Sequence, residues 1–318
     1  RVADSVVAFA FLETLQERGR QGMNQALLET VKREQPQVVV VVPYTDQLIP
    51  EVIDKINHYT PTVGYFFDDM WRIQYARFWA RHFSFVTTSD INGVQKFREA
   101  GCHNVIYSPF ACNHHIFVKK DLPKLYDVTF VGQYHPYREW YLRQLRKAGI
   151  NVRFWGHRWE EGRLDQEEMV KVFNQSRINL NISNSVSWDL RYLISGSRAV
   201  KNTLASVWRQ DSKIREQVKG RHFEINACGG FQISYYVEGL EHCYRIGKEI
   251  ALYASPEELV EKIRYYLKYE AEREAIAQQG YERTLAEHTM EKRLQQLFEQ
   301  IGVFKQVADV PGTAAEAH

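Results

Sequence analysis

The hydrophobic positions of the first hundred residues alternate between helical and strand-like spacing. Leu27, Leu28 and Val31 lie at helical spacing within residues 22–34, and Pro36 ends that helix. The valine run at 38–42 is apolar on both faces, which is typical of a buried strand in a parallel sheet. The alternation continues, with helices predicted at 47–58, 70–81 and 90–100 and strands at 62–67, 83–87 and 104–107. This order predicts a doubly wound α/β domain.

The same alternation restarts after a polar crossover at 111–126. Helices are predicted at 137–148 and 166–175, and strands at 127–131, 151–155, 178–182, 231–235 and 249–253. Ser255, Pro256 and Glu258 supply a capping residue, a first-turn proline and a capping-box glutamate for a further helix, and residues 271–301 predict one or two closing helices. The predicted fold class is therefore α/β, with two Rossmann-like doubly wound domains facing a cleft.

The segment between residues 183 and 220 interrupts this rhythm. It contains no predicted strand, and connections of this length in compact domains are often functional loops. Its aromatic and cationic residues can stack and bind anions, and they are Trp188, Arg191, Tyr192, Trp208 and Arg209. Two interpretations stay open: a lid or acceptor-binding loop, and a small helical insertion packed on the domain.

Length and composition agree with two packed domains. The chain has 318 residues, 44% of them hydrophobic and 13% aromatic, which suits two domains of about 150 residues each. The net charge of +2 gives no general attraction to nucleic acid, and the longest apolar run, at 38–43, is too short for a membrane span. The four cysteines form no CxxC pair and we find no signal peptide, so we expect a reduced, cytoplasmic protein without a zinc site.

The stretch RHFEINACGGFQISYY, residues 221–236, combines charge with a small-residue turn. Arg221 and Glu224 precede the turn Ala227–Gly230, which leads into a predicted strand. Glycines let a ligand approach the backbone closely, and open parallel sheets bind ligands at the carboxyl ends of their strands. An arginine suits phosphate and a carboxylate suits sugar hydroxyls, so the stretch favours a sugar nucleotide. The alternative is a structural ion pair between the two side chains.

The stretch from 221 to 267 resembles the donor-binding half of GT-B glycosyltransferases, and is most similar to the group named for the spore maturation protein CgeB. The strand DVTFVG (127–132) with Arg138 behind it, the segment RFWGHRW (153–159) and the segment SPFACNHHIF (108–117) resemble the same family. The resemblance implies a GT-B fold whose final helices cross back to the first domain.

The resemblance also assigns roles to residues. It implies that Glu224 contacts hydroxyls of the donor, that Gly229 and Gly230 bind its phosphates through backbone N–H groups, and that Arg221 and Arg138 neutralise the diphosphate. Gly132 would lie under the phosphates, and Gly156 near the base. His157 follows a strand and either touches the donor or is a surface histidine. Cys228 belongs to the glycine turn, as part of the donor site or as a small packed residue.

Two carboxylates are candidates for catalysis. Asp68, followed by Asp69, lies at the end of a predicted strand where the cleft is expected, and is either a base or a solvated residue beside a helix cap. Glu216 precedes Glu224 by the spacing found in retaining members of the family, although the glycine-phenylalanine pair that normally follows the first glutamate is absent. The adjacent His114 and His115 would diverge on a strand, so we predict no shared metal there.

The predicted function is the transfer of a sugar, of hexosyltransferase type, from a nucleotide-diphosphate sugar such as a UDP or GDP sugar. No metal or other cofactor is expected, and the acceptor is a glycan, lipid, protein or small molecule. Alternatives are an epimerase or hydrolase of nucleotide sugars on the same fold, and a non-catalytic nucleotide-sugar-binding module of a larger protein.

The predicted domains are an acceptor-side domain at 1–118, a donor domain at 119–290, a returning helix at 291–306 and a disordered tail at 307–318. The chain begins with Arg1, and the first strand unit usual in this fold is not recognisable. Two interpretations stay open: the acceptor side is incomplete, or another part of a longer polypeptide or an associated domain supplies that unit.

Overall fold

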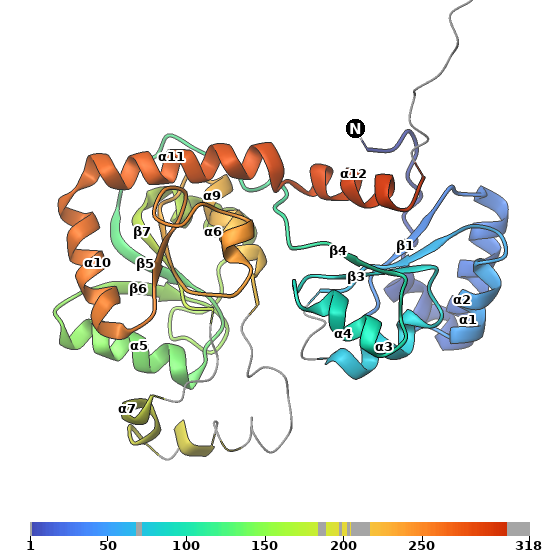
Figure 1. Cartoon of the computed structure of the whole chain (residues 1–318), viewed down its shortest axis with the longest axis horizontal. Coiled ribbons are helices and arrows are strands. Elements are labelled where there is room, and N and C mark those ends of the chain that lie inside the picture. The colour runs from blue at the N-terminus through green and yellow to red at the C-terminus, as the bar shows by residue number, and fades with distance from the viewer. Residues whose placement is uncertain are drawn as a thin grey trace, which may run out of the picture.

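The computed structural model describes residues 2–67, 72–183, 189–196, 199–201, 204 and 217–303. These residues form two α/β domains, each built on a parallel sheet, as the sequence predicts (Figure 1). The first sheet has the order β1-β2-β3-β4. Its strands are β1 (Val39–Val41), β2 (Thr62–Gly64), β3 (Phe85–Thr88) and β4 (Val105–Tyr107).

The second sheet has the order β6-β5-β7-β8-β9, and all its neighbouring strands are parallel. Its strands are β5 (Tyr126–Val131), β6 (Val152–Trp155), β7 (Ser176–Asn181), β8 (Gln232–Tyr235) and β9 (Ala251–Tyr253). The strand order reverses between β5 and β7. In open parallel sheets such a reversal leaves a crevice at the carboxyl ends of the strands, where ligands bind.

Helices surround both sheets. Those of the first domain are α1 (Phe11–Glu34), α2 (Pro50–Ile56), α3 (Ile73–Ala80) and α4 (Gly93–Glu99). Those from the second domain onward are α5 (Pro136–Lys147), α6 (Gln166–Gln175), α7 (Leu190–Leu193), α9 (Gly220–Ala227), η3 (Leu240–His242), α10 (Pro256–Lys268), α11 (Glu270–Glu287) and α12 (Met290–Gln300). None of the described helices combines the length and apolarity of a membrane-spanning helix.

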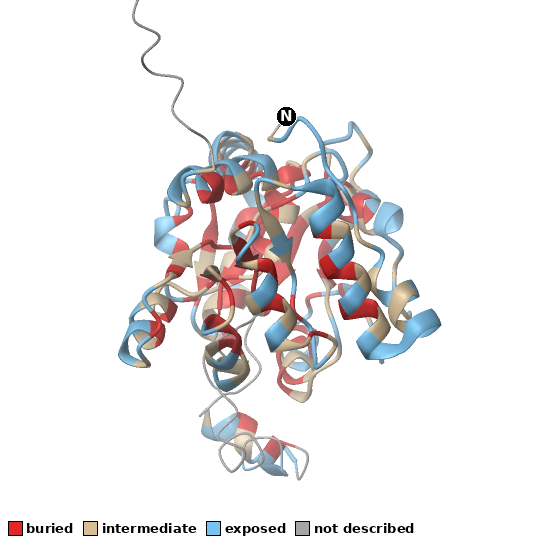
Figure 2. Cartoon of the chain, turned by 90° about the vertical axis from the view of Figure 1, so that its right-hand side faces the viewer, coloured by how far each residue is buried: buried red, intermediate tan, exposed pale blue. Residues whose placement is uncertain are grey.

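Local sequence explains the clearest helix boundaries. Asp165 accepts a hydrogen bond from the Glu168 backbone while Glu168 bonds back to the Asp165 backbone, a capping box that begins α6. Ser255 caps α10 as predicted, and Pro256 stands in its first turn. Buried residues gather on the strands and on the helix faces toward them, and exposed residues lie on the outer faces of the helices (Figure 2).

Two crossings join the domains. The linker after β4 leads into the second domain, and the chain returns from α11 to α12, which lies over the first domain (Figure 1). The crossings run side by side, because the Cys112 N–H donates to the His288 carbonyl at 3.0 Å and the Met290 N–H donates to the Cys112 carbonyl at 2.8 Å. Leu297 and Phe298 of α12 then pack against Val63 and Tyr65 of the first domain.

Part of the segment 183–220 packs on the second domain. Tyr192 of α7 is 1% exposed and its ring contacts Tyr137 and Trp140 of α5. Arg191 pairs with Asp189 and with Glu257 of α10. These contacts agree with a packed insertion for residues 189–196, whereas Trp188, Trp208 and Arg209 lie outside the described residues. The predicted tail at 307–318 also lies outside them.

Candidate functional site

The carboxyl ends of the two sheets meet. Asp90, just after β3, accepts a hydrogen bond from the Gln217 side chain at 3.4 Å, although the two residues are 127 positions apart. A Cβ atom on Gly220 would lie 3.7 Å from the ring of Phe110, which follows β4. A Cβ atom on Gly239, after β8, would lie 3.4 Å from Ile91. The ends of β3 and β4 therefore face the segments around α9 and β8, which is where the sequence predicts a cleft.

Helix α9 points its amino terminus into this cleft. It runs antiparallel to β8, because Asn226 hydrogen-bonds Gln232 at 2.6 Å near one end and His222 hydrogen-bonds Ser234 at 3.0 Å near the other. Its first residue, Gly220, thus lies at the carboxyl edge of the second sheet. The first N–H groups of any α-helix have no partner within the helix, and its dipole favours an anion there. This is a backbone site suited to phosphate.

Arg221 and Glu224 form the ion pair that the alternative interpretation proposed. The guanidinium and carboxylate lie 2.7 Å apart, and each side chain is about a quarter exposed, at 25% and 23%. Arg221 also lies 5.0 Å from the ring centre of Phe173 and contacts the sulfur of Met169, both on α6. Burial raises the pKa of Glu224 and lowers that of Arg221, while their mutual attraction opposes both shifts. The pair is held within one turn of the α9 amino terminus.

His222 fixes α9 on the sheet. The side chain is fully buried, with Nδ1 at the Lys219 backbone and Nε2 at the Ser234 hydroxyl. Burial lowers the pKa of His222 to about 4, so the ring is neutral near neutral pH. This histidine therefore positions the site rather than serving as a proton donor at its surface.

The loops after β5 and β6 close on each other. Gly156 has a φ of 148°, and a Cβ atom there would stand 2.0 Å from the carbonyl oxygen of Gly132. That oxygen accepts a hydrogen bond from the Trp159 indole at 2.8 Å. Arg138 donates to the Gln133 carbonyl after β5 and to the Ile182 carbonyl after β7, at 2.8 and 2.9 Å. Its guanidinium therefore bridges the point where the strand order reverses.

Polar atoms at the end of β7 lack partners. Among the described residues, the Asn181 side-chain nitrogen and the Ser183 hydroxyl are buried without a hydrogen bond. Leaving a buried polar group unpaired costs about 1–3 kcal/mol, so such groups usually await a ligand or water. Both atoms belong to the same carboxyl edge as Arg138 and Gly220.

A protein-family model described as glycosyl transferase-like matches residues 138–299, about half of the chain. The chain belongs to this glycosyl transferase-like family. The match covers most of the second domain, including Arg138, α9 and the return into α12. A search of curated proteins finds no match.

Solved GT-B structures share the fold of this glycosyl transferase-like chain. Sucrose-phosphate synthase from Thermosynechococcus elongatus aligns with a TM-score of 0.61 and 11% identity over 95% of this chain and 81% of its own. A glycosyltransferase from Rickettsia africae aligns with a TM-score of 0.61 and 10% identity, over 96% and 84%. Anabaena HepE, solved in complex with UDP-glucose, aligns with a TM-score of 0.57 and 10% identity, over 94% and 90%. The fold is therefore GT-B.

The glycine turn of this glycosyl transferase-like chain lies elsewhere than predicted. Gly229 and Gly230 follow the carboxyl end of α9 and precede β8, at the sheet edge opposite the cleft. A Cβ atom on Gly229 would meet the Lys119 side chain at 2.8 Å, and one on Gly230 would meet Asn179 at 2.9 Å. Gly229 has a φ of 65°, a backbone conformation that favours glycine, and the Lys119 side chain is flexible enough to move. Close packing against Asn179 and the Ile225 backbone explains Gly230. Cys228 is 1% exposed in the same apolar cluster, which agrees with its alternative interpretation as a small packed residue.

The remaining predicted residues divide between two groups. Gly132, Gly156, Arg138 and Glu224 belong to the carboxyl edge of the second sheet, and His157 is exposed on the loop after β6, where its carbonyl accepts from Tyr134 at 2.9 Å. Asp68, Asp69 and Glu216 lie outside the described residues, so their roles stay predictions.

Three cleft residues were missed from the sequence: Asp90, Asn181 and Gln217. The first two shared a usable signal, since each is a polar residue at or just after the end of a buried strand. Such positions gather at one edge of a parallel sheet. Gln217 carried no local signal, because only the fold brings it to Asp90.

Proposed function

We propose that the chain transfers a sugar from a nucleoside diphosphate sugar to an acceptor hydroxyl in the cleft between its two domains. The observation that supports this most strongly is the α9 amino terminus, which lies at the boundary between the domains beside the partly buried carboxylate of Glu224. Together they offer donors for a diphosphate and an acceptor for sugar or ribose hydroxyls.

The diphosphate would bind the backbone N–H groups of Gly220 and Arg221. Gly220 presents no side chain there, and the Glu224 carboxylate lies 3.4 Å from the position that a Cβ atom would take. Arg138, at the strand-order reversal, adds a fixed positive charge on the other side of the crevice. Fixed cations and a helix dipole stabilise the charge that develops on a leaving diphosphate, so the proposed mechanism requires no metal.

Glu224 would accept hydrogen bonds from the donor hydroxyls. Arg221, 2.7 Å away, favours the ionised carboxylate against the effect of burial. An ionised acceptor binds hydroxyl groups more strongly than a neutral one. Removing the charge should therefore weaken donor binding more than it disturbs the fold.

In the transfer, the acceptor oxygen forms a bond to the anomeric carbon of the donor sugar. The bond from that carbon to the β-phosphate oxygen breaks, and the nucleoside diphosphate leaves. The proton of the acceptor hydroxyl passes to a base or to the leaving phosphate oxygen. We propose Asp90 as the first candidate base, since the Asn92 N–H at 2.8 Å and Gln217 at 3.4 Å orient its carboxylate at the cleft.

The acceptor would approach from the first domain. Phe67 after β2 and Phe110 after β4 have ring centres 5.3 Å apart, and Phe110 borders Gly220. This apolar wall stands opposite the donor groups and suits the ring face of a sugar or another partly apolar acceptor.

UDP is the first nucleotide to test, because HepE was solved with UDP and UDP-glucose and the pneumococcal O-GlcNAc transferase GtfA with UDP. A hexose as the transferred sugar, a CgeB-like subgroup and a cytoplasmic location remain parts of the proposal.

The experiment compares thermal shifts of the chain with UDP, GDP, ADP, dTDP and CMP, followed by assays of UDP-glucose turnover with and without acceptor mixtures. One diphosphate should stabilise the fold selectively. Glu224→Gln should bind it about tenfold or more weakly, because a hydrogen bond to a charged group contributes about 1.5–3 kcal/mol. Glu287→Gln, which alters the helical pair with Arg283, is the matched control and should bind normally.

Other outcomes of these assays would favour one of the alternative functions. Sugar release without an acceptor would favour the hydrolase, and conversion of the donor sugar the epimerase. Binding without turnover would favour a non-catalytic module. No shift with any nucleotide, or equal binding by Glu224→Gln and the wild type, would refute the proposed donor site.

A further inference from the structure

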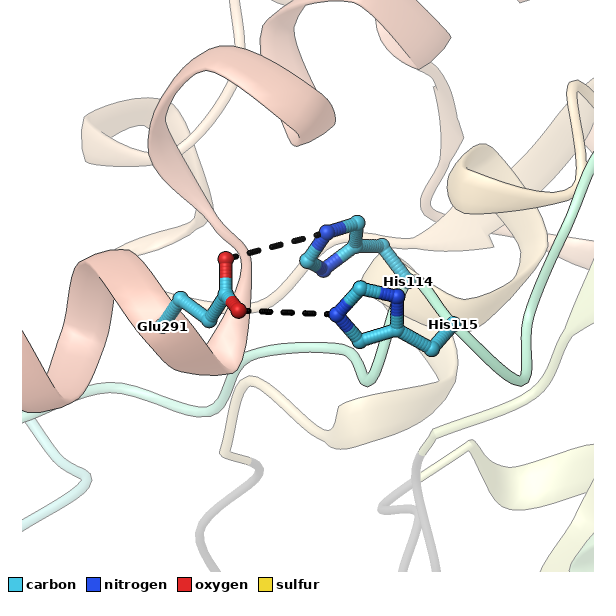
Figure 3. A group of neighbouring side chains, drawn as sticks. All are labelled: His114, His115 and Glu291. Atoms are coloured by element: carbon cyan, nitrogen blue, oxygen red, sulfur yellow. Dashed lines mark hydrogen bonds and ion pairs between the residues drawn. The ribbon is translucent and has the colours of Figure 1, made fainter. Parts of the chain in front are cut away.

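A second cluster of chemically active side chains lies outside the cleft. His114 and His115 extend from the interdomain linker toward Glu291 in the first turn of α12 (Figure 3). The His115 Nε2 lies 3.5 Å from one carboxylate oxygen, and the His114 Nε2 lies 3.9 Å from the other. We call these three residues the linker triad.

The linker triad corrects our prediction that the two histidines diverge. They lie in a turn that begins at Asn113, whose side chain accepts the His115 N–H at 3.1 Å and whose carbonyl accepts the Phe117 N–H at 2.9 Å. In this turn neighbouring side chains need not alternate as they do on a strand. The two imidazole centres are therefore only 4.1 Å apart, on the same side of the chain.

We propose that the linker triad binds a divalent transition-metal ion of the zinc type. Its ligand atoms all lie within 4.8 Å of one another. Zinc binds imidazole nitrogen and carboxylate oxygen at about 2.0–2.2 Å, and tetrahedral ligands at that radius lie about 3.3 Å apart. The separations of 3.5 and 3.9 Å run to the two different oxygens of Glu291, so the side chains must rotate to bring all three ligand atoms to one ion.

Ligand chemistry favours zinc over the harder cations. Two imidazoles with one carboxylate suit zinc, copper or nickel, whereas magnesium and calcium prefer oxygen ligands alone. Three protein ligands leave one tetrahedral position for solvent or a further ligand. The side chains are accessible to an incoming ion, since His115 is 70% and Glu291 48% exposed.

The position of the triad gives the ion a mechanical role. His114 and His115 follow Cys112 on the outgoing crossing, and Glu291 follows Met290 on the returning one. Backbone hydrogen bonds already pair these crossings at Cys112 and His288. A bound ion would add a coordinate link between them and so restrict movement of one domain relative to the other.

The alternative is that the histidines simply pair with Glu291. Such partly exposed ion pairs contribute about 0–1 kcal/mol and bind no metal. Because both interpretations use the same residues, only metal binding itself distinguishes them.

The experiment is a calorimetric titration of the chelator-treated full chain with ZnCl₂, and with MgCl₂ in parallel. We expect one zinc ion per chain and no magnesium binding. His114→Ala, His115→Ala and Glu291→Gln should each weaken zinc binding at least about tenfold, because each removes a ligand. His103→Ala, at an exposed histidine elsewhere in the first domain, should bind zinc like the wild type.

Cobalt provides a second readout, because its visible absorption reports the geometry of the bound ion. The wild type should give the visible absorption of tetrahedral Co²⁺, and the three triad variants should lose it while keeping their circular dichroism spectra. Absence of saturable zinc binding, or zinc binding and a cobalt spectrum unchanged in all three triad variants, would overturn the proposal. Neither result depends on whether the chain transfers sugar.

Discussion

Replacing Gly156 by alanine tests whether close backbone packing shapes the loops of the donor site. Gly156 has a φ of 148°, a region that residues with a side chain rarely adopt. A Cβ atom there would stand 2.0 Å from the Gly132 oxygen and 2.6 Å from the Gly132 carbonyl carbon. Neither atom belongs to a flexible side chain, so the loop after β5 would have to move.

The expected loss in the free energy of unfolding has two parts. Holding an alanine in a left-handed backbone conformation costs about 1–2 kcal/mol. Forcing an extra carbon into packed structure adds about 1–3 kcal/mol. We therefore expect Gly156→Ala to lower the free energy of unfolding by about 2–5 kcal/mol.

Gly149→Ala separates the two parts. Gly149 follows α5 with a φ of 77°, and a Cβ atom there meets nothing within 4 Å. Its replacement should cost only the backbone part, about 1–2 kcal/mol. Urea unfolding followed by tryptophan fluorescence measures both variants. If they agree within about 0.5 kcal/mol, the contact between the two loops does not constrain the site and the reasoning fails.

Three further substitutions test the proposed base, the buried histidine and the anchoring of α12. Asp90→Asn should lower kcat for sugar transfer by about 10²–10⁴-fold, because it removes the proposed general base, and should leave nucleotide affinity unchanged. A loss of nucleotide binding in calorimetry that parallels the loss of kcat would contradict that role. Because burial lowers the pKa of His222 from 6.5 to about 4, its stabilisation is complete above pH 6.5 and lost as the pH falls toward 4. Between pH 7 and pH 4 the free energy of unfolding should fall by about 3 kcal/mol from this histidine, as measured by urea unfolding. In His222→Gln the free energy should depend less steeply on pH, and an equal slope in the variant would exclude His222 as the cause. Leu297→Ala should cost about 2–5 kcal/mol in the same assay, because this side chain is 1% exposed against the first domain, and a loss below about 1 kcal/mol would mean that α12 does not anchor there.

Most of the fold was predictable because its strands are strongly patterned. The centres of β5 and β7 are buried on both faces, so their sequences carry no helical period. The valine run correctly predicted a strand, but β1 lies at the edge of its sheet and Val40 is 40% exposed, so the prediction that it is buried was wrong. Helix α9 was missed because its sequence has no clear helical pattern of hydrophobic residues. It spans eight residues, and Arg221 and Glu224 occur where an isolated sequence suggests a charged hinge. Its helical conformation depends on His222 and Asn226 bonding to β8.

The candidate site was only partly predictable, because a sequence shows the type of each residue but not at which edge of the sheet that residue lies. The glycine pair 229–230 was predicted to bind the donor phosphates, yet it lies beside Lys119 and Asn179 at the other end of α9. Glu224 could be singled out because a carboxylate near a glycine is a local signal, and its role in donor binding stays a prediction. The contact between Asp90 and Gln217 has no local signal, because it depends on how two domains face each other.

The interdomain contacts also indicate how closure of the cleft could be controlled. On the cleft side, the described contacts include the side-chain hydrogen bond between Asp90 and Gln217 at 3.4 Å. The crossing side is joined by backbone hydrogen bonds at 2.8 and 3.0 Å and by the apolar contacts of α12. Since weak contacts break first, relative motion should open the cleft and pivot about the paired crossings. The linker triad lies at that pivot, so an ion bound there would change the freedom of the cleft without touching either substrate.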